Sequence, residues 1–107
     1  MPFEFGDVIL IRFPFTSQTS AKQRPAAVVS NRAYNKTRPD VVAMAITSVL
    51  EPGAVLIVDW QAAGLLRESV FKPVFATFEQ QAIARQLGTL AEGDRAALKK
   101  LIGEVLG

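Results

Sequence analysis

Helical periodicity is confined to the end of this 107-residue chain. The apolar positions that recur there on one helical face are Leu98, Leu101, Ile102, Val105 and Leu106. Everything before them consists of short apolar runs, rich in β-branched residues, that are separated by polar segments, as is typical of strands. Strands first and one helix last predict a mainly β (α+β) fold, a small and strongly bent antiparallel sheet or barrel with a C-terminal helix over residues 92–106.

The spacing of the apolar runs predicts the strands and connections of a single domain over residues 1–107. We expect strands at 7–13, 26–30, 41–47, 54–58, 69–78 and 85–90. The run 7–13 is almost continuously apolar, which predicts burial on both faces. The connections are expected to be a long hairpin loop at 14–23, a second, basic loop at 31–40, a capped helical turn at 59–64 and a polar turn at 79–84.

The apolar helix face could lie on a membrane surface or pack on the domain or on a sister subunit. Its polar face is short and carries charges of both signs, which favours packing on the domain or on a sister subunit. Hydrophobic residues make up 50% of the chain, a high share for its size, which predicts a buried homodimer interface. The N-terminus has an acid where a signal peptide needs Lys or Arg, and no apolar run approaches the ~20 residues of a membrane span. We therefore expect a cytoplasmic protein with no membrane partner.

The chain contains neither cysteine nor histidine. This excludes disulfides, thiol nucleophiles, Ser–His–Asp triads and histidine- or cysteine-bound metals. No glycine-rich phosphate-binding motif is present, and the carboxylates are scattered, so we expect no cofactor and no metal.

The net charge is only +2, but its distribution is uneven. Residues 22–38 contain five basic side chains and no acidic one. These are Lys22, Arg24, Arg32, Lys36 and Arg38. Such a segment attracts phosphates, although solvated loops can have the same composition.

The chemistry that remains is that of arginine, lysine and hydroxyl side chains acting on phosphate. Arg24 precedes Pro25 at the start of one predicted strand, and Thr47 and Ser48 lie at the tail of another. A guanidinium matches a phosphate geometrically, and hydroxyl groups can hold its oxygens. The ordinary alternative is a surface arginine and a strand-ending turn.

Several segments together resemble the MazF/PemK/Kid family of toxin endoribonucleases. The opening GDVILI at 6–11, RPAAVVS at 24–30 and AITS at 45–48 occur in the family's order, and RQLGTL at 85–90 is similar to its ending. This resemblance implies an SH3-like barrel, a homodimer, metal-free cleavage of single-stranded RNA, and a cognate antitoxin through which alone the protein would reach DNA.

The resemblance also implies which residues form the site. The family's catalytic arginine and threonine fall on Arg24 and Thr47. The expected substrate-binding residues are Phe15, Thr16, Lys22, Ser48 and Lys72. The segment 71–78 is more aromatic than the family pattern, so the residues of a base pocket do not transfer there.

The mechanism expected from this reading is attack by the substrate's own 2′-hydroxyl on the adjacent phosphorus. Arg24 would hold the phosphoryl oxygens and Thr47 would orient the phosphate or the attacking hydroxyl. Two alternatives remain at this stage, a toxin on the same barrel that poisons DNA gyrase, and a barrel that only binds nucleic acid or protein.

Overall fold

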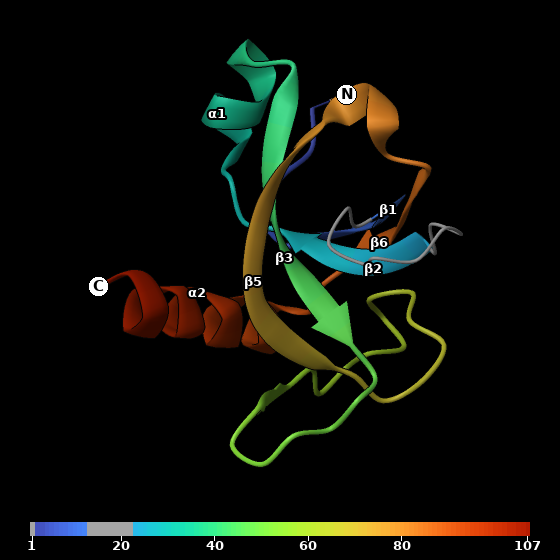
Figure 1. Ribbon diagram of the computed structural model, residues 1–107, viewed down its shortest axis with the longest axis vertical. Coiled ribbons are helices and arrows are strands. Elements are labelled where there is room, and N and C mark those ends of the chain that lie inside the picture. The colour runs from blue at the N-terminus through green and yellow to red at the C-terminus, as the bar shows by residue number, and fades with distance from the viewer. Residues whose placement is uncertain (1, 13–22) are drawn as a thin grey trace.

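The computed structural model describes residues 2–12 and 23–107, which form one six-stranded antiparallel sheet in the order β4-β5-β3-β2-β1-β6 (Figure 1). The strands are β1 (Asp7–Arg12), β2 (Gln23–Val28), β3 (Asp40–Thr47), β4 (Val55–Leu56), β5 (Val70–Glu79) and β6 (Arg85–Thr89). The helices are α1 (Arg32–Thr37), the single 3₁₀ turn η1 (Gln80–Ala82) and α2 (Glu92–Leu106). The predicted mainly β fold with a C-terminal helix is confirmed.

The sheet curls into a half-barrel, with the long strand β5 arching across it (Figure 1). β5 pairs with β3 along nearly its whole length, and the register shifts between Met44 and Ala45. A second shift lies in β1 between Val8 and Ile9, where β1 pairs with β6. Irregularities of this kind bend a strand and increase its local twist, which is how a sheet of six short strands curls.

Apolar side chains cover both faces of the curled sheet, because neighbouring residues on a strand point to opposite sides. One buried cluster contains Val8 of β1, Ala27 of β2 and Met44 of β3, together with Leu98 of α2. The other contains Ile9, Ile11, Ala26, Val28, Val41 and Ala43. The prediction that the first strand is buried on both faces is therefore confirmed.

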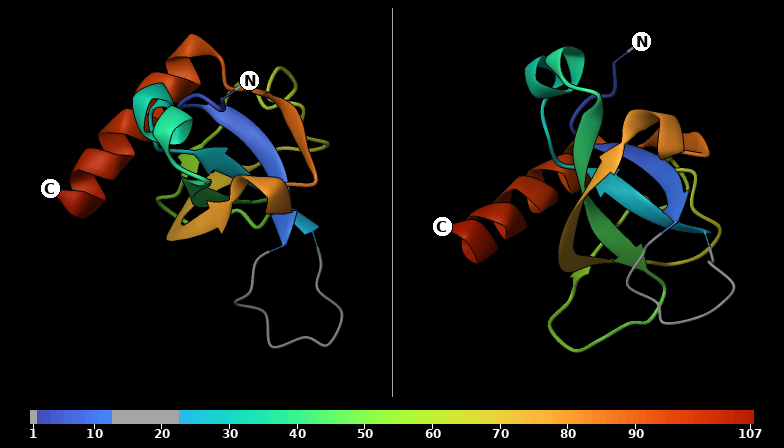
Figure 2. Two further views of the ribbon diagram at one scale, coloured as in Figure 1. Left: turned by 90° about the horizontal axis from the view of Figure 1, so that it is seen from above. Right: turned by 45° about the horizontal axis from the view of Figure 1, so that its top comes forward.

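α2 lies along the outside of the sheet and is attached by its N-terminal half (Figure 2). The buried carboxylate of Asp94 accepts hydrogen bonds from the backbone N–H groups of Val58, at 2.8 Å, and Asp59, at 2.9 Å. The other end of the helix points away from the body, and Val105 and Leu106 are 45% and 68% exposed. The expected packing on the domain thus holds for the first turns, while the last turn leaves apolar side chains uncovered.

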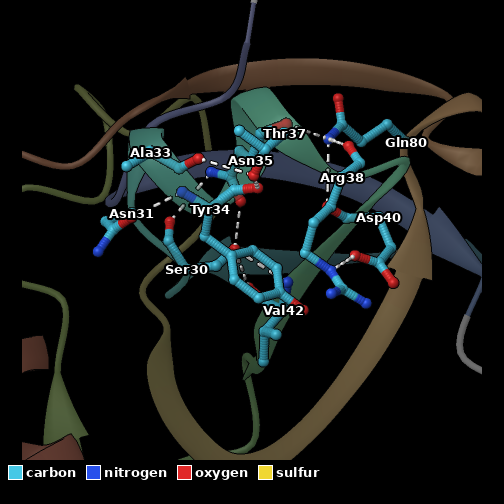
Figure 3. Close-up of polar contacts among 10 residues, drawn as sticks. All are labelled: Ser30, Asn31, Ala33, Tyr34, Asn35, Thr37, Arg38, Asp40, Val42 and Gln80. Carbon is cyan, nitrogen blue, oxygen red and sulfur yellow. Dashed lines mark hydrogen bonds and ion pairs between the residues drawn. The ribbon is translucent and has the colours of Figure 1, made fainter.

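The predicted loop over residues 31–40 is wrong in its middle, because residues 32–37 form helix α1 (Figure 3). The segment has no apolar periodicity, and polar contacts hold the helix instead. Asn31 caps it by accepting the N–H of Tyr34 at 2.9 Å. The buried amide of Asn35 donates to the carbonyl oxygens of Phe3, at 2.8 Å, and Ser30, at 3.0 Å.

Several predicted boundaries also shift. β2 begins at Gln23 and ends at Val28, so Arg24 lies within the strand and residues 29–30 do not. The strand expected at 54–58 is reduced to Val55–Leu56. Of the long hairpin loop expected at 14–23, residues 14–22 lie outside the described part of the chain.

The main chain of the turn at 59–64 packs directly against the main chain of β6. Asp59 begins it by accepting the N–H of Ala62 at 3.2 Å, and Gly64 ends it with φ +79°, as the expected capped turn requires. A Cβ atom at Gly64 would lie 2.1 Å from the carbonyl oxygen of Leu87, and one at Gly88 would lie 2.7 Å from the carbonyl carbon of Ala63. Only glycine fits at these two facing positions. None of the helices in the described residues is long and apolar enough to span a membrane.

Candidate active site

Four strands meet at one end of the curled sheet, and this is where the candidate site lies. β1 is antiparallel to β2 and β6, and β2 is antiparallel to β3, so β1 and β3 end where β2 and β6 begin. Leu10 of β1 lies opposite Pro25 of β2 on one side and opposite Arg85 of β6 on the other. The topology therefore brings residues from distant parts of the sequence to a common edge.

Arg24 and Thr47 both lie at this edge, near the ends of neighbouring strands. β2 and β3 pair from Val28 with Ala43 as far as Ala26 with Ala45, and Arg24 and Thr47 each lie two residues beyond that last pair. Both residues line one pocket of about 310 Å³. Ser48, which follows β3, lines the same pocket. The structure thus brings together three residues that were predicted from the sequence.

Two further arginines line this pocket. Arg67 comes from the loop before β5, and Arg85 is the first residue of β6. The remaining walls are mainly apolar, formed by Leu10, Pro25, Ile46, Leu65, Leu66 and Leu87. We call the pocket with Arg24, Arg67 and Arg85 the arginine pocket.

The charge of the arginine pocket is uncompensated within the described residues. No carboxylate lines it, and none of its three arginines forms an ion pair with an acidic side chain in residues 2–12 or 23–107. In that same part of the chain, no three carboxylates come close enough to share a metal ion. Three permanent positive charges around one cavity form a site for an anion with several oxygens, such as a phosphate.

The hydroxyl of Thr47 is oriented by the backbone. Its oxygen accepts a hydrogen bond from the N–H of Val49 at 3.1 Å, which occupies one of the two lone pairs. The hydroxyl proton is then available to an acceptor in the pocket. Thr47 therefore offers a hydroxyl donor to the pocket that Arg24, Arg67 and Arg85 also line.

A second pocket, of about 220 Å³, adjoins the first, and Thr47 lines both. Lys72, predicted as a substrate-binding residue, lies here and not in the arginine pocket. Phe15, Thr16 and Lys22 fall in the segment 13–22, outside the described residues, so their predicted roles stay predictions.

The basic residues around α1 do not line either of these pockets. Arg38 instead donates to the carboxylate of Asp40 at 3.0 Å and lies 4.9 Å from the centre of the Tyr34 ring (Figure 3). This hydrogen bond from Arg38 holds the pKa of Asp40 below its usual value, and it raises the pKa of the arginine. Part of the positive charge expected to attract phosphate is therefore neutralised locally.

Arg67 and Arg85 were not identified as site residues from the sequence. Arg67 is followed by Glu68, and Arg85 stands among uncharged residues, so neither belongs to a basic cluster. Their common pocket arises only when β6 pairs with β1 and the 59–69 segment folds over that edge. No local pattern could have found them.

Comparison with known proteins identifies the family and the fold. A sequence profile described as PemK-like, MazF-like toxin of type II toxin–antitoxin system matches residues 4–106. No match was found among curated protein sequences.

Similar solved structures include MazF from Deinococcus radiodurans, with 20% identity, a TM-score of 0.77 and coverage of 100% of this chain and 98% of the other. A mycobacterial endoribonuclease solved in complex with its cognate antitoxin has 21% identity and a TM-score of 0.77, covering 99% of this chain and 94% of the other. The Mycobacterium tuberculosis toxin MazF-mt6 has 21% identity and a TM-score of 0.75, covering 94% and 95%. At these identities the structural likeness concerns the fold, and the profile match over almost the whole sequence supplies the family. The chain belongs to the PemK-like, MazF-like toxins of type II toxin–antitoxin systems.

Proposed function

We propose that this toxin is an endoribonuclease that cuts single-stranded RNA without a metal ion. The observation that carries the proposal is that Arg24 and Thr47 line one pocket together with two further arginines and no carboxylate. RNA is a polyanion whose phosphates match guanidinium groups, and the family to which the chain belongs supplies the toxin role.

The nucleophile is the 2′-hydroxyl of the substrate. Its oxygen forms a bond to the adjacent phosphorus while the bond from phosphorus to the 5′ oxygen of the next nucleotide breaks. The 2′-hydroxyl proton passes to water, and the leaving oxygen takes a proton from water. The products are a 2′,3′-cyclic phosphate and a 5′-hydroxyl, and no protein nucleophile is needed.

Arg24 and Thr47 act on the reacting phosphate. Negative charge grows on the non-bridging oxygens as the phosphorus becomes five-coordinate, and the Arg24 guanidinium stabilises it more strongly than it stabilises the ground state. A guanidinium is permanently protonated, so its role is electrostatic. Thr47 donates its hydroxyl proton to one phosphate oxygen and fixes the phosphate in place.

Arg67 and Arg85 bind phosphates of the same strand and hold it across the pocket. A single strand can turn its nucleotides so that the 2′-hydroxyl, the phosphorus and the leaving oxygen fall in line, whereas a duplex resists this. This is the reason for a single-stranded substrate.

The partners we propose are a second copy of the chain and a cognate antitoxin, with DNA contacted only through the antitoxin. Exposed apolar side chains support a protein partner. These are Val49, Leu50, Leu56, Val58, Leu66, Val105 and Leu106. RNA as substrate and an antitoxin as partner imply a cytoplasmic protein.

The proposal is tested by incubating the purified toxin with a defined single-stranded RNA in EDTA and identifying the ends. We expect cleavage products with 2′,3′-cyclic phosphate and 5′-hydroxyl ends. We also expect the cleavage rate in EDTA to equal the rate without EDTA. Intact RNA together with inhibited supercoiling by DNA gyrase would instead support a gyrase poison. RNA that is bound but never cut would support a binding module.

The dimer is tested by light scattering at micromolar concentration. We expect twice the mass of the 11.6 kDa chain. A monomeric mass would contradict the proposed dimer and leave the ribonuclease proposal standing.

A further inference from the structure

The second pocket differs in chemistry from the arginine pocket that it adjoins. Its walls include the apolar side chains of Val55, Val70 and Pro73, and its charged lining residues are one acid, Glu51, and one base, Lys72. Its volume of about 220 Å³ lies below the roughly 300–1,000 Å³ typical of pockets that enclose a whole small molecule. It suits one flat ring of a larger ligand.

Glu51 and Lys72 line this pocket without neutralising each other. They form no ion pair together, and within residues 2–12 and 23–107 neither is paired with another charged group. Two opposite charges that stay apart around a small apolar pocket offer an acceptor and a donor to a polar ligand edge.

The backbone of Glu51 is held in a tight turn. The N–H of Ala54 donates to the carbonyl oxygen of Glu51 at 3.1 Å, Pro52 follows Glu51, and Gly53 has φ +79°. Proline at the second position and a left-handed glycine at the third are the features of a type II turn. The main chain at Glu51 is therefore held by the turn, in the segment that follows β3 (Figure 1).

We propose that this pocket takes the base of a nucleotide next to the cleaved bond, and that Glu51 selects guanine there. The inference rests on the proposed ribonuclease function, because it takes Thr47 as the residue that holds the reacting phosphate. Thr47 lines both pockets, so a phosphate bound at Thr47 has the arginine pocket on one side and the Glu51 pocket on the other. The base of an adjoining nucleotide then reaches the second pocket.

Guanine fits these groups better than the other bases. Its Watson–Crick edge has two neighbouring N–H donors, at N1 and N2, which match the two oxygens of a carboxylate. The adjoining O6 accepts a hydrogen bond from the Lys72 ammonium. Adenine and cytosine each put a ring nitrogen acceptor beside the amino group, which a carboxylate repels, and uracil has only one N–H donor.

The experiment uses two sets of four RNA oligonucleotides, one set varying the base before the cut and the other the base after it. The variants are Glu51→Gln, which keeps the shape and loses the charge, and Glu104→Gln, a matched control on the exposed side of α2. We expect the wild-type protein to cut fastest with guanine at one neighbouring position. Glu51→Gln lowers that preference on the order of tenfold, because a good bidentate pair discriminates by about that factor or more, and Glu104→Gln leaves it unchanged.

Inosine at the same position provides a second, independent readout because it lacks only the N2 amino group. Wild-type cleavage falls several-fold with inosine, whereas Glu51→Gln distinguishes inosine and guanine weakly. Cleavage without a guanine preference at either position, or a preference that survives Glu51→Gln, would overturn the inference and leave the ribonuclease proposal intact. Failure of the wild type to cut any RNA would overturn both.

Discussion

Arg24 and Thr47 each lie two residues beyond Ala26 and Ala45, the last pair between the antiparallel strands β2 and β3. They are 23 positions apart in the sequence, yet the register of β2 and β3 brings them to one pocket.

Replacing Arg24 with alanine should lower the cleavage rate on the order of 10²-fold or more, because one preorganised group that stabilises the transition state is worth that much. The fold should be unaffected, since Arg24 is exposed. Arg32→Ala, an exposed arginine on α1, is the matched control and should cut at the wild-type rate. A folded Arg24→Ala protein with normal activity would remove Arg24 from the site.

Replacing Thr47 with valine, which is nearly isosteric, should lower the rate by about ten- to a hundredfold, because one hydrogen bond to a charged group is lost. Thr47→Ser keeps the hydroxyl and should recover most of the activity. Single-turnover rates of both variants at saturating enzyme give the comparison. Equal rates for the valine and serine variants would mean that the hydroxyl takes no part.

Arg67→Ala and Arg85→Ala should each weaken RNA binding and reduce its salt dependence. Each phosphate neutralised on a single strand contributes about −0.7 to the slope of log K against log salt concentration, so each substitution should make the slope shallower by about that amount. Titrations with an uncleavable RNA over a range of salt concentrations measure it. An unchanged slope in either variant would show that this arginine binds no phosphate.

Replacing Asp94 with alanine should lower the free energy of unfolding by about 2 kcal/mol, since the N–H groups of Val58 and Asp59 lose their buried acceptor. Glu92→Ala, in the same turn of α2 but exposed, should change it by less than about 0.5 kcal/mol. Urea titrations followed by tryptophan fluorescence and circular dichroism compare the two variants. Similar values for both would mean that Asp94 does not anchor the helix.

Deoxyribose on the 5′ side of the cut should abolish cleavage but preserve binding. The nucleophile is missing, whereas phosphate contacts do not sense the sugar. Gel analysis of the products and a binding titration on the same oligonucleotide separate the two effects. Cleavage of the substituted strand at the same bond would mean that water or a side chain attacks.

Most of the sheet could be predicted from the sequence because its strands are apolar runs bounded by proline, glycine and polar residues. α1 could not, since its stability comes from contacts such as the one between Asn35 and the carbonyl of Phe3, 32 positions away. The short extent of β4 has a similar cause. Only Val55 and Leu56 pair with β5, and the N–H groups of Val58 and Asp59 instead donate to the carboxylate of Asp94, 36 and 35 positions away.

The candidate site was predictable only where its residues lie at strand ends within recognisable segments. Arg24 beside Pro25, and Thr47 at the end of an apolar run, met that condition. Arg67 and Arg85 did not meet that condition. Counting charges along a sequence cannot detect basic residues that come together only in the folded sheet. The opposite error concerned Arg38. Its positive charge was counted in a basic segment, but in the folded protein Arg38 forms an ion pair with Asp40.

The close approach of the 59–64 turn to β6 has a consequence for the width of the arginine pocket. Gly64 meets the main chain of Leu87, and Gly88 meets that of Ala63. Gly64 lies three residues before Arg67 and Gly88 three residues after Arg85, so both contacts are near the arginines along the chain. A side chain at either glycine would force the turn and the strand apart. The span over which the site can hold neighbouring phosphates would then change without the alteration of any residue that touches them.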